Sequence, residues 1–159
     1  MEESLNIFDK ATRYILDFFD SSNSYDSVIS SIHPYISYVA IALPIFLLIY
    51  HADDIKNIFV STIVLILAYI TGYDAFLKYA QTLPNEASNM LATHKFLALV
   101  VVLIYLVVLV LKILNSASKK LSCEKFCSIV LSFAVLLILI ITYYGTSMVF
   151  NYGVGVVVK

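Results

Sequence analysis

Charged residues are scarce in this chain of 159 residues: 13% are Asp, Glu, Lys or Arg, whereas 61% are hydrophobic. A soluble domain of this length has too small a core to bury so many apolar side chains. The excess must face lipid, and the apolar residues gather into long runs, as spanning segments require. The formal net charge is −1 and the basic residues form no patch, which excludes a nucleic-acid-binding protein.

Only two cysteines are present, and they argue against most metal and redox centres. Cys123 and Cys127 lie at the start of the last apolar run. A lone pair cannot complete a four-ligand zinc or iron–sulfur site, and His51 does not supply enough further ligands. We therefore interpret both cysteines as reduced thiols that fill small apolar spaces.

Acidic residues are missing from the apolar runs, which disfavours a transporter because no ion or proton path is evident. The runs predict four transmembrane helices over about residues 34–50, 57–73, 94–114 and 126–150. Pro44 is expected to kink the first helix. Because the runs are continuously apolar rather than alternating, helices are favoured over a β-barrel. The expected fold is all-α, an integral membrane four-helix bundle over residues 31–159.

Residues 1–30 precede the first span and lack the features of a secretory signal, because acids crowd the start and Asp17 and Asp20 interrupt the only apolar candidate. Apolar residues recur here at helical spacing: Leu5, Phe8, Thr12, Ile15 and Phe19. The pattern predicts an N-terminal amphipathic interfacial helix. A loosely ordered tail is the alternative.

Four crossings place the N-terminal segment, the 72–95 connection and the C-terminal tail on one face, named side A here, and the other two loops on side B. Near the helix ends, side B has Lys56, Lys112, Lys119, Lys120 and Lys125, and side A has Lys78, Lys95 and Lys159. The positive-inside rule then predicts that side B is cytoplasmic and that both termini are extracytoplasmic.

The histidines are the most informative residues for function. His33 opens the first span and His94 the third, so antiparallel alternation places both at side A and at comparable depth, whereas His51 ends the first span on side B. A six-coordinate haem b needs two axial ligands on opposite faces of the porphyrin. We predict that His33 and His94 bind the iron of one haem b. The alternative is that both histidines simply lie in the headgroup region.

Other residues near side A complete the predicted site. Ala98 shares a helical face with His94, and Gly145 lies on the fourth span; small residues let a flat macrocycle approach the backbone. Met148 is the substitute ligand, because Pro34 biases the backbone of His33 away from the helix. The tyrosines at side A are expected to form an interfacial belt: Tyr35, Tyr38, Tyr73, Tyr143, Tyr144 and Tyr152.

Several short motifs accompany these residues: HP at His33, IALPI around Pro44, TGYDA from Thr71, AxHKFLAL around His94, and the tail YYGTSMVFNYGVGV from Tyr143. From about Ser31 to the end, the chain resembles the bacterial family of four-helix membrane proteins classed as domain of unknown function 2231. Tyr152 stands where relatives commonly have a histidine. The resemblance implies a bacterial inner (cytoplasmic) membrane protein, with redox partners such as Rieske-type iron–sulfur modules.

The expected function is that of a small b-type cytochrome, an electron-transfer subunit of a respiratory complex rather than a stand-alone enzyme. It would pass electrons from a membrane quinol to a membrane or extracytoplasmic redox protein, with Asp74 or Glu86 accepting quinol protons. The alternative is a cofactor-free structural or anchoring subunit of a larger membrane complex. The N-terminal helix and contacts of Gly145, Gly153 and Gly155 would hold it there.

Overall fold

The computed structural model describes Lys10 and residues 26–51, 54–80, 83–118 and 124–154. The predicted interfacial helix falls almost entirely outside the described residues, as do Cys123 and Gly155. Residues 26–30, which the sequence analysis assigned to the N-terminal segment, belong to the first described helix.

Four long helices make up the described part of the chain: α2 (Asp26–His51), α3 (Ile55–Tyr79), α4 (Asn85–Ser118) and α5 (Glu124–Tyr152). They contain 25 to 34 residues. At about 1.5 Å per residue, even the shortest exceeds the roughly 30 Å thickness of a bilayer core. Each helix has a stretch long and apolar enough to span. The all-α membrane bundle is therefore confirmed, and the protein is a multi-pass membrane protein.

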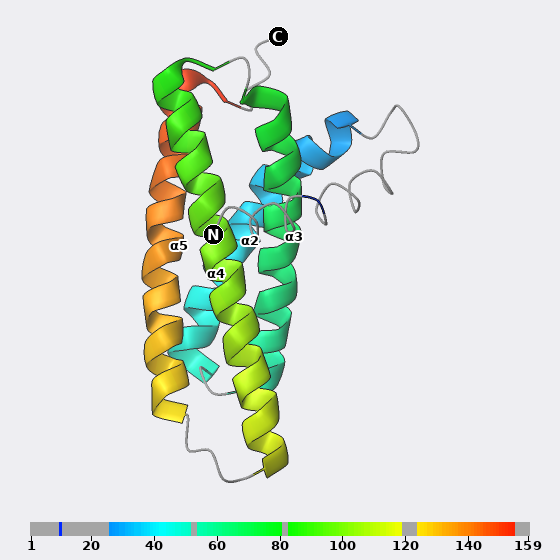
Figure 1. Cartoon of the computed structure of the whole chain (residues 1–159), viewed down its shortest axis with the longest axis vertical. Helices are drawn as coiled ribbons and strands as arrows, with labels where there is room; N and C mark the ends of the chain where they lie inside the picture. The colour runs from blue at the N-terminus through cyan, green and yellow to red at the C-terminus, as the bar shows by residue number, and fades with distance from the viewer. Residues whose placement is uncertain (1–9, 11–25, 52–53, 81–82, 119–123, 155–159) are drawn as a thin grey trace.

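Consecutive helices run in opposite directions and pack side by side, as Figure 1 shows. Helix α2 also packs against α5, which closes the ring of four helices. The first turns of α2 and α4 therefore lie at the same end of the bundle as the last turns of α3 and α5 (Figure 1). This end is side A, and it brings together residues far apart in the sequence.

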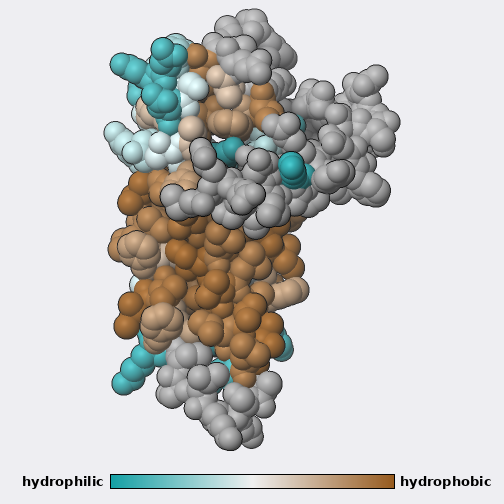
Figure 2. Space-filling model, viewed as in Figure 1, coloured by the Kyte–Doolittle hydropathy of each residue, from teal (hydrophilic) through white to brown (hydrophobic). Residues whose placement is uncertain are grey.

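Apolar side chains occupy both the interior and the outer surface of the bundle. Leu65, Leu99 and Leu131 are buried between the helices, whereas four large side chains are each more than half exposed: Phe46, Phe59, Phe133 and Leu136. Figure 2 shows the resulting hydrophobic band, with hydrophilic residues towards the two ends. Such a surface suits a lipid environment, where helices associate through close packing rather than by escaping water.

Local interactions fix where the helices begin and end. The Asp54 carboxylate accepts a hydrogen bond of 2.9 Å from the backbone N–H of Lys56, which caps the first turn of α3. At the other end of the bundle, α5 ends at Tyr152 and is followed by Gly153, whose φ of 65° suits glycine. The Gly153 N–H donates to the carbonyl of Val149 at 3.0 Å. The tail glycine thus terminates the last helix.

The helices extend beyond the predicted spans. Hydropathy identifies only the residues that lie in lipid, whereas the backbone hydrogen bonds of a helix continue into the polar residues on either side. Helix α4 begins at Asn85, well before the predicted residue 94. The expectation that Pro34 turns His33 out of the helix is wrong, since α2 runs through both Pro34 and Pro44. A proline inside a membrane helix loses one hydrogen bond, a loss that neighbouring helices help to compensate.

Candidate functional site

His33 projects from α2 onto α3 at side A. Its Nδ1 lies 3.0 Å from Oγ1 of Thr71, 38 positions further along the chain. The ring also lies against Gly72, where a β-carbon would come within 2.7 Å of His33 Cε1. Because real side chains do not tolerate that distance, only glycine at position 72 admits the imidazole in this position.

The surroundings of Thr71 favour one tautomer of His33. Thr71 Oγ1 lies 3.0 Å from the carbonyl of Leu67 and 3.1 Å from that of Ala68, either of which can accept the hydroxyl proton. With the hydroxyl donating to a carbonyl, the threonine oxygen accepts from His33 Nδ1. In this tautomer of the neutral imidazole the lone pair is on Nε2.

His94 projects from α4 onto α5 in a similar way. Its Nδ1 lies 3.0 Å from the backbone carbonyl of Ile141. Because a carbonyl can only accept, Nδ1 must donate and the lone pair is again on Nε2. The ring lies against Gly145, where a β-carbon would come within 3.2 Å of His94 Cε1. A glycine on the next helix thus makes room for each imidazole.

The two helical hairpins therefore hold their histidines by the same device. In each, the first helix supplies the imidazole, and the second supplies an acceptor for Nδ1 and a glycine beneath the ring. The structure thus places both histidines at side A, the end of the bundle at which the sequence analysis predicted them.

This donor set fits a metal bound by two neutral imidazoles. Histidine ligands of metals commonly donate their second ring N–H to a carbonyl or another acceptor, which fixes the tautomer and strengthens the ligand. His33 and His94 both do so through Nδ1. The glycines let each imidazole pack directly on the backbone of the neighbouring helix, in the space that a β-carbon would otherwise fill.

Ser37 is a further neighbour of His33 on α2. Its Oγ lies 3.3 Å from Nε2 and 3.5 Å from Nδ1 of the imidazole. The hydroxyl can donate a long hydrogen bond to the Nε2 lone pair. Binding of a metal at Nε2 would therefore replace the Ser37 contact while leaving the Thr71 contact intact.

Three of the remaining predicted site residues lie towards side A, and His51 lies at side B. Met148 is buried in α5, about one turn beyond Gly145. Ala98 is half-buried and packs against the core. Gly145 contacts the imidazole of His94 itself. His51 is the last residue of α2, at side B, far from the histidine pair.

The predicted tyrosine belt needs one correction. Tyr35, Tyr38 and Tyr143 are exposed on the outer surface, as the prediction requires, but Tyr73 is buried. The Nζ of Lys95 lies 4.8 Å from the centre of the Tyr73 ring and 4.3 Å from that of Phe76. Cation–π contacts of this kind join α3 to α4 directly beside His94.

No group of three or more His, Cys, Asp or Glu side chains suited to a metal ion occurs within the described ranges. Cys127 is buried among core residues, as expected for a small apolar filler.

Sequence reasoning missed Thr71, Gly72 and Ser37 as parts of the site. The TG pair within TGYDA was noted only as a motif, and no pattern indicated that it faces His33. The helical alternation supplied a usable signal, because a residue near the end of α3 must lie level with one near the start of α2.

A family model described as "Predicted membrane protein (DUF2231)" matches residues 55–158. The match covers α3, α4 and α5 and so includes Thr71, Gly72, His94 and Gly145, whereas His33 precedes it. No curated protein and no solved structure matches the chain.

Proposed function

The chain belongs to the DUF2231 family of predicted membrane proteins, and from the geometry at side A we propose that it is a small b-type cytochrome subunit. His33 and His94 would hold the iron of one haem b. The observation that carries the proposal is the shared tautomer: both rings donate from Nδ1 to a fixed acceptor, and both have the lone pair on Nε2.

The protein residues have distinct tasks in this proposal. Thr71 and the Ile141 carbonyl hold the two rings, and Gly72 and Gly145 let the rings pack against the neighbouring helices. The surrounding apolar helices exclude water and lower the local dielectric constant, which tunes the potential of a bound iron. When bound, haem b supplies reversible one-electron transfer, and the chain supplies ligands and orientation.

A membrane quinol is the proposed electron donor, and a membrane or extracytoplasmic redox subunit is the proposed acceptor at side A. Quinol oxidation releases protons, so a carboxylate near the site is required. Glu86 at the start of α4 is exposed and accepts a 3.4 Å hydrogen bond from the Tyr152 hydroxyl at the end of α5. This pair ties α4 to α5 at side A, and the Glu86 carboxylate would accept a proton from the quinol and pass it to the water outside.

The proposed location is the bacterial inner (cytoplasmic) membrane, with the chain's ends and the histidine pair on the extracytoplasmic side. The lysine distribution supports this orientation. His33 and His94 would then hold the haem near the outer leaflet, so the chain would serve electron transfer at that face and not across the whole bilayer.

The experiment is a reduced-minus-oxidised absorption spectrum of the full chain, purified in detergent after expression with added haem precursor. A haem ligated by two histidines gives sharp α and Soret bands on reduction. Colourless protein that is otherwise folded and helical by circular dichroism would refute the cytochrome assignment.

One observation favours a second candidate function, a cofactor-free anchoring subunit of a larger membrane complex. The Thr71 hydroxyl lies within hydrogen-bond distance of His33 Nδ1 and the Ser37 hydroxyl within that of Nε2, so two protein side chains suffice to satisfy the imidazole. The sequence analysis expected glycines to make the contacts with a partner subunit. In the structure Gly145 packs on His94, and Gly153 terminates α5. A stable, colourless protein that co-purifies with other membrane subunits would favour this second function.

A further inference from the structure

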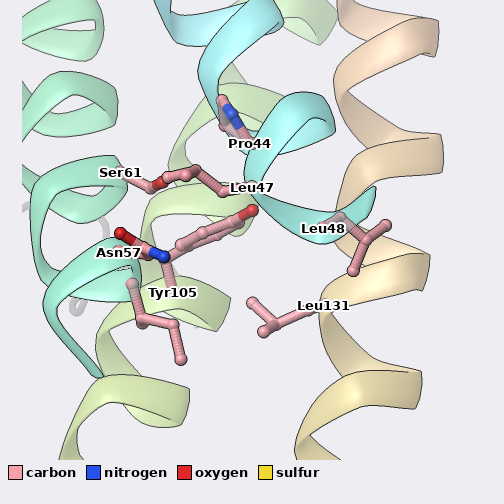
Figure 3. Close-up of a pocket in the computed structure, with 8 residues that line it drawn as sticks. Pro44, Leu47, Leu48, Asn57, Ser61, Tyr105 and Leu131 are labelled. Atoms are coloured by element: carbon pink, nitrogen blue, oxygen red, sulfur yellow. The ribbon is translucent and has the colours of Figure 1, made fainter. Parts of the chain in front are cut away.

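An apolar groove lies on the outer surface of the bundle, between α4 and α5. Its lining includes Val107 and Leu111 of α4 and Phe126 of α5. Val107 and Phe126 are each more than half exposed. The groove has a volume of about 280 Å³. By contrast, the hollow beside Pro44, shown in Figure 3, measures about 20 Å³ and admits only a water-sized molecule. The groove is therefore the hollow with room for part of a lipid.

The groove occupies the side B half of the bundle and runs along the helices. Phe126 lies in the first turn of α5, which begins at Glu124. From Leu111 the lining of α4 extends back to Val100, which is about 16 Å along the axis at about 1.5 Å per residue. One leaflet contributes about 15 Å to a hydrocarbon core of roughly 30 Å. The groove thus matches an acyl chain of the side B leaflet in length and direction.

The chemistry of the lining favours a flexible hydrocarbon chain over a second helix. Every lining residue is Val, Leu, Ile or Phe. Helices in membranes pack closely through Gly, Ala and Ser, and none of these is among the residues that line the groove. A spanning helix of a second copy would also need a contact surface over roughly 30 Å, about twice the length of the groove. An acyl chain is therefore the better occupant.

Positive charge gathers at the side B end of the groove. The connection between α4 and α5 and the start of α5 contain three lysines and one acidic residue, Glu124. The lysines are Lys119, Lys120 and Lys125, and Lys125 is exposed. The two aspartates of side B belong to the α2–α3 connection, on the opposite edge of the ring of helices. Lysines at this depth attract lipids with anionic headgroups.

We propose that the groove binds one acyl chain of an anionic phospholipid, whose headgroup lies at side B beside Lys125. The chain extends along α4 towards Val100, and the phosphate pairs with the ammonium group of Lys125. A cytoplasmic side B agrees with this occupant, because anionic lipids are concentrated in the cytoplasmic leaflet. The histidine pair lies at the other end of the bundle, so the lipid site does not depend on the proposed haem.

Native mass spectrometry of the full chain, released from detergent micelles, measures which lipids stay bound. The protein is mixed with equal amounts of phosphatidylglycerol and phosphatidylcholine that carry the same acyl chains. We expect one phosphatidylglycerol per chain to be retained several times more often than phosphatidylcholine, because only phosphatidylglycerol has a net negative charge. Equal retention of the two lipids would overturn the proposal.

Val107→Phe tests whether the lipid lies in the groove, because the larger side chain fills the space and should lower retention several-fold. Val110→Phe is the matched control: Val110 is on the same helix, is 52% exposed against 58% for Val107, and lies outside the groove. Circular dichroism checks the fold of both variants, and Leu103→Phe replaces Val107→Phe if the latter does not fold. Unchanged retention in a folded groove variant would contradict the site. If the groove variant instead removed a bound quinone or split a dimer, another occupant would be shown and the proposal would be wrong.

Lys125→Gln tests the position of the headgroup. Loss of one lysine near an anionic headgroup should lower retention of phosphatidylglycerol about fivefold, with retention of phosphatidylcholine unchanged. Lys56→Gln is the matched control, because Lys56 is also exposed at side B but lies at the start of α3 in the other hairpin. Equal losses in the two lysine variants, or no loss in Lys125→Gln, would contradict the proposed contact.

Discussion

The imidazole of His33 lies on the backbone of Gly72, so closely that a β-carbon at position 72 would be 2.7 Å from Cε1. His94 lies on Gly145 with slightly more room, at 3.2 Å. Each pair joins two helices of one hairpin. Both glycines lie inside a helix and not in a turn. Close approach, not backbone flexibility, therefore explains glycine at both positions.

Gly72→Ala should displace His33. Alanine normally stabilises a helix by about 1 kcal/mol relative to glycine, but here the new methyl group collides with a ring that must then leave its rotamer. We expect lower haem content and a lower melting temperature, with a smaller loss for Gly145→Ala. Haem content per protein and thermal unfolding measure both effects.

Gly153→Ala is the control for these variants, because no neighbouring atom lies within 4 Å of a β-carbon there. Its positive φ predicts some destabilisation, whereas haem content should be unchanged. If Gly72→Ala retained full haem content, the close packing of His33 on α3 would not matter for the site.

Thr71→Val should disturb the site without changing its volume. The substitution removes the Thr71 hydroxyl from His33 Nδ1, and the loss of such a hydrogen bond costs about 1 kcal/mol. We expect a less firmly held His33, a shifted reduction potential and weaker haem retention, measured by redox titration. Thr62→Val is the matched control, since the Thr62 hydroxyl bonds only within α3. An identical potential in Thr71→Val and wild type would remove Thr71 from the site.

Lys95 is expected to stabilise side A through its cation–π contacts with Tyr73 and Phe76. Lys95→Met keeps a long apolar side chain but loses the charge, which should cost roughly 0.5 to 2 kcal/mol of unfolding free energy. A double-mutant cycle with Phe76→Leu should show coupling, because the second substitution matters less once the charge is gone. Strict additivity of the two losses would argue against the contact.

The orientation is testable by fusions of alkaline phosphatase, which is active only outside the cytoplasm. A fusion after Lys159 should be active, and a fusion after Ser118, in the α4–α5 connection on side B, should be inactive. The expectation follows from the excess of lysines at side B. The reverse pattern would place the histidine pair at the cytoplasmic face.

Hydropathy predicted the number of helices, since four apolar runs allow little else. It did not predict their ends: the polar first turns of α4, with Asn85 and Glu86, continue the helix outside the apolar run. The shared depth of His33 and His94 followed from antiparallel alternation alone. The predicted domain division at residue 30 falls within α2 and beside residues that the structure does not describe.

The sequence did not predict how each helix is rotated about its axis. Nearly every face of these helices is apolar, so no amphipathic pattern indicates which face is buried. For that reason Tyr73 was assigned to the surface although it is buried. The same uncertainty hid the contacts of His33 with Thr71 and Gly72. Only packed coordinates show which residue of α3 lies beneath the imidazole.

Ligation of one haem b by His33 and His94 is tested most directly by the haem-to-protein ratio of three purified variants, His33→Ala, His94→Ala and His51→Ala. We predict one haem per chain in the wild type and in His51→Ala, whose histidine lies at side B. Replacement of either His33 or His94 should abolish the six-coordinate spectrum and most of the haem. Full haem content with an unchanged spectrum in either of these two variants would contradict the assignment.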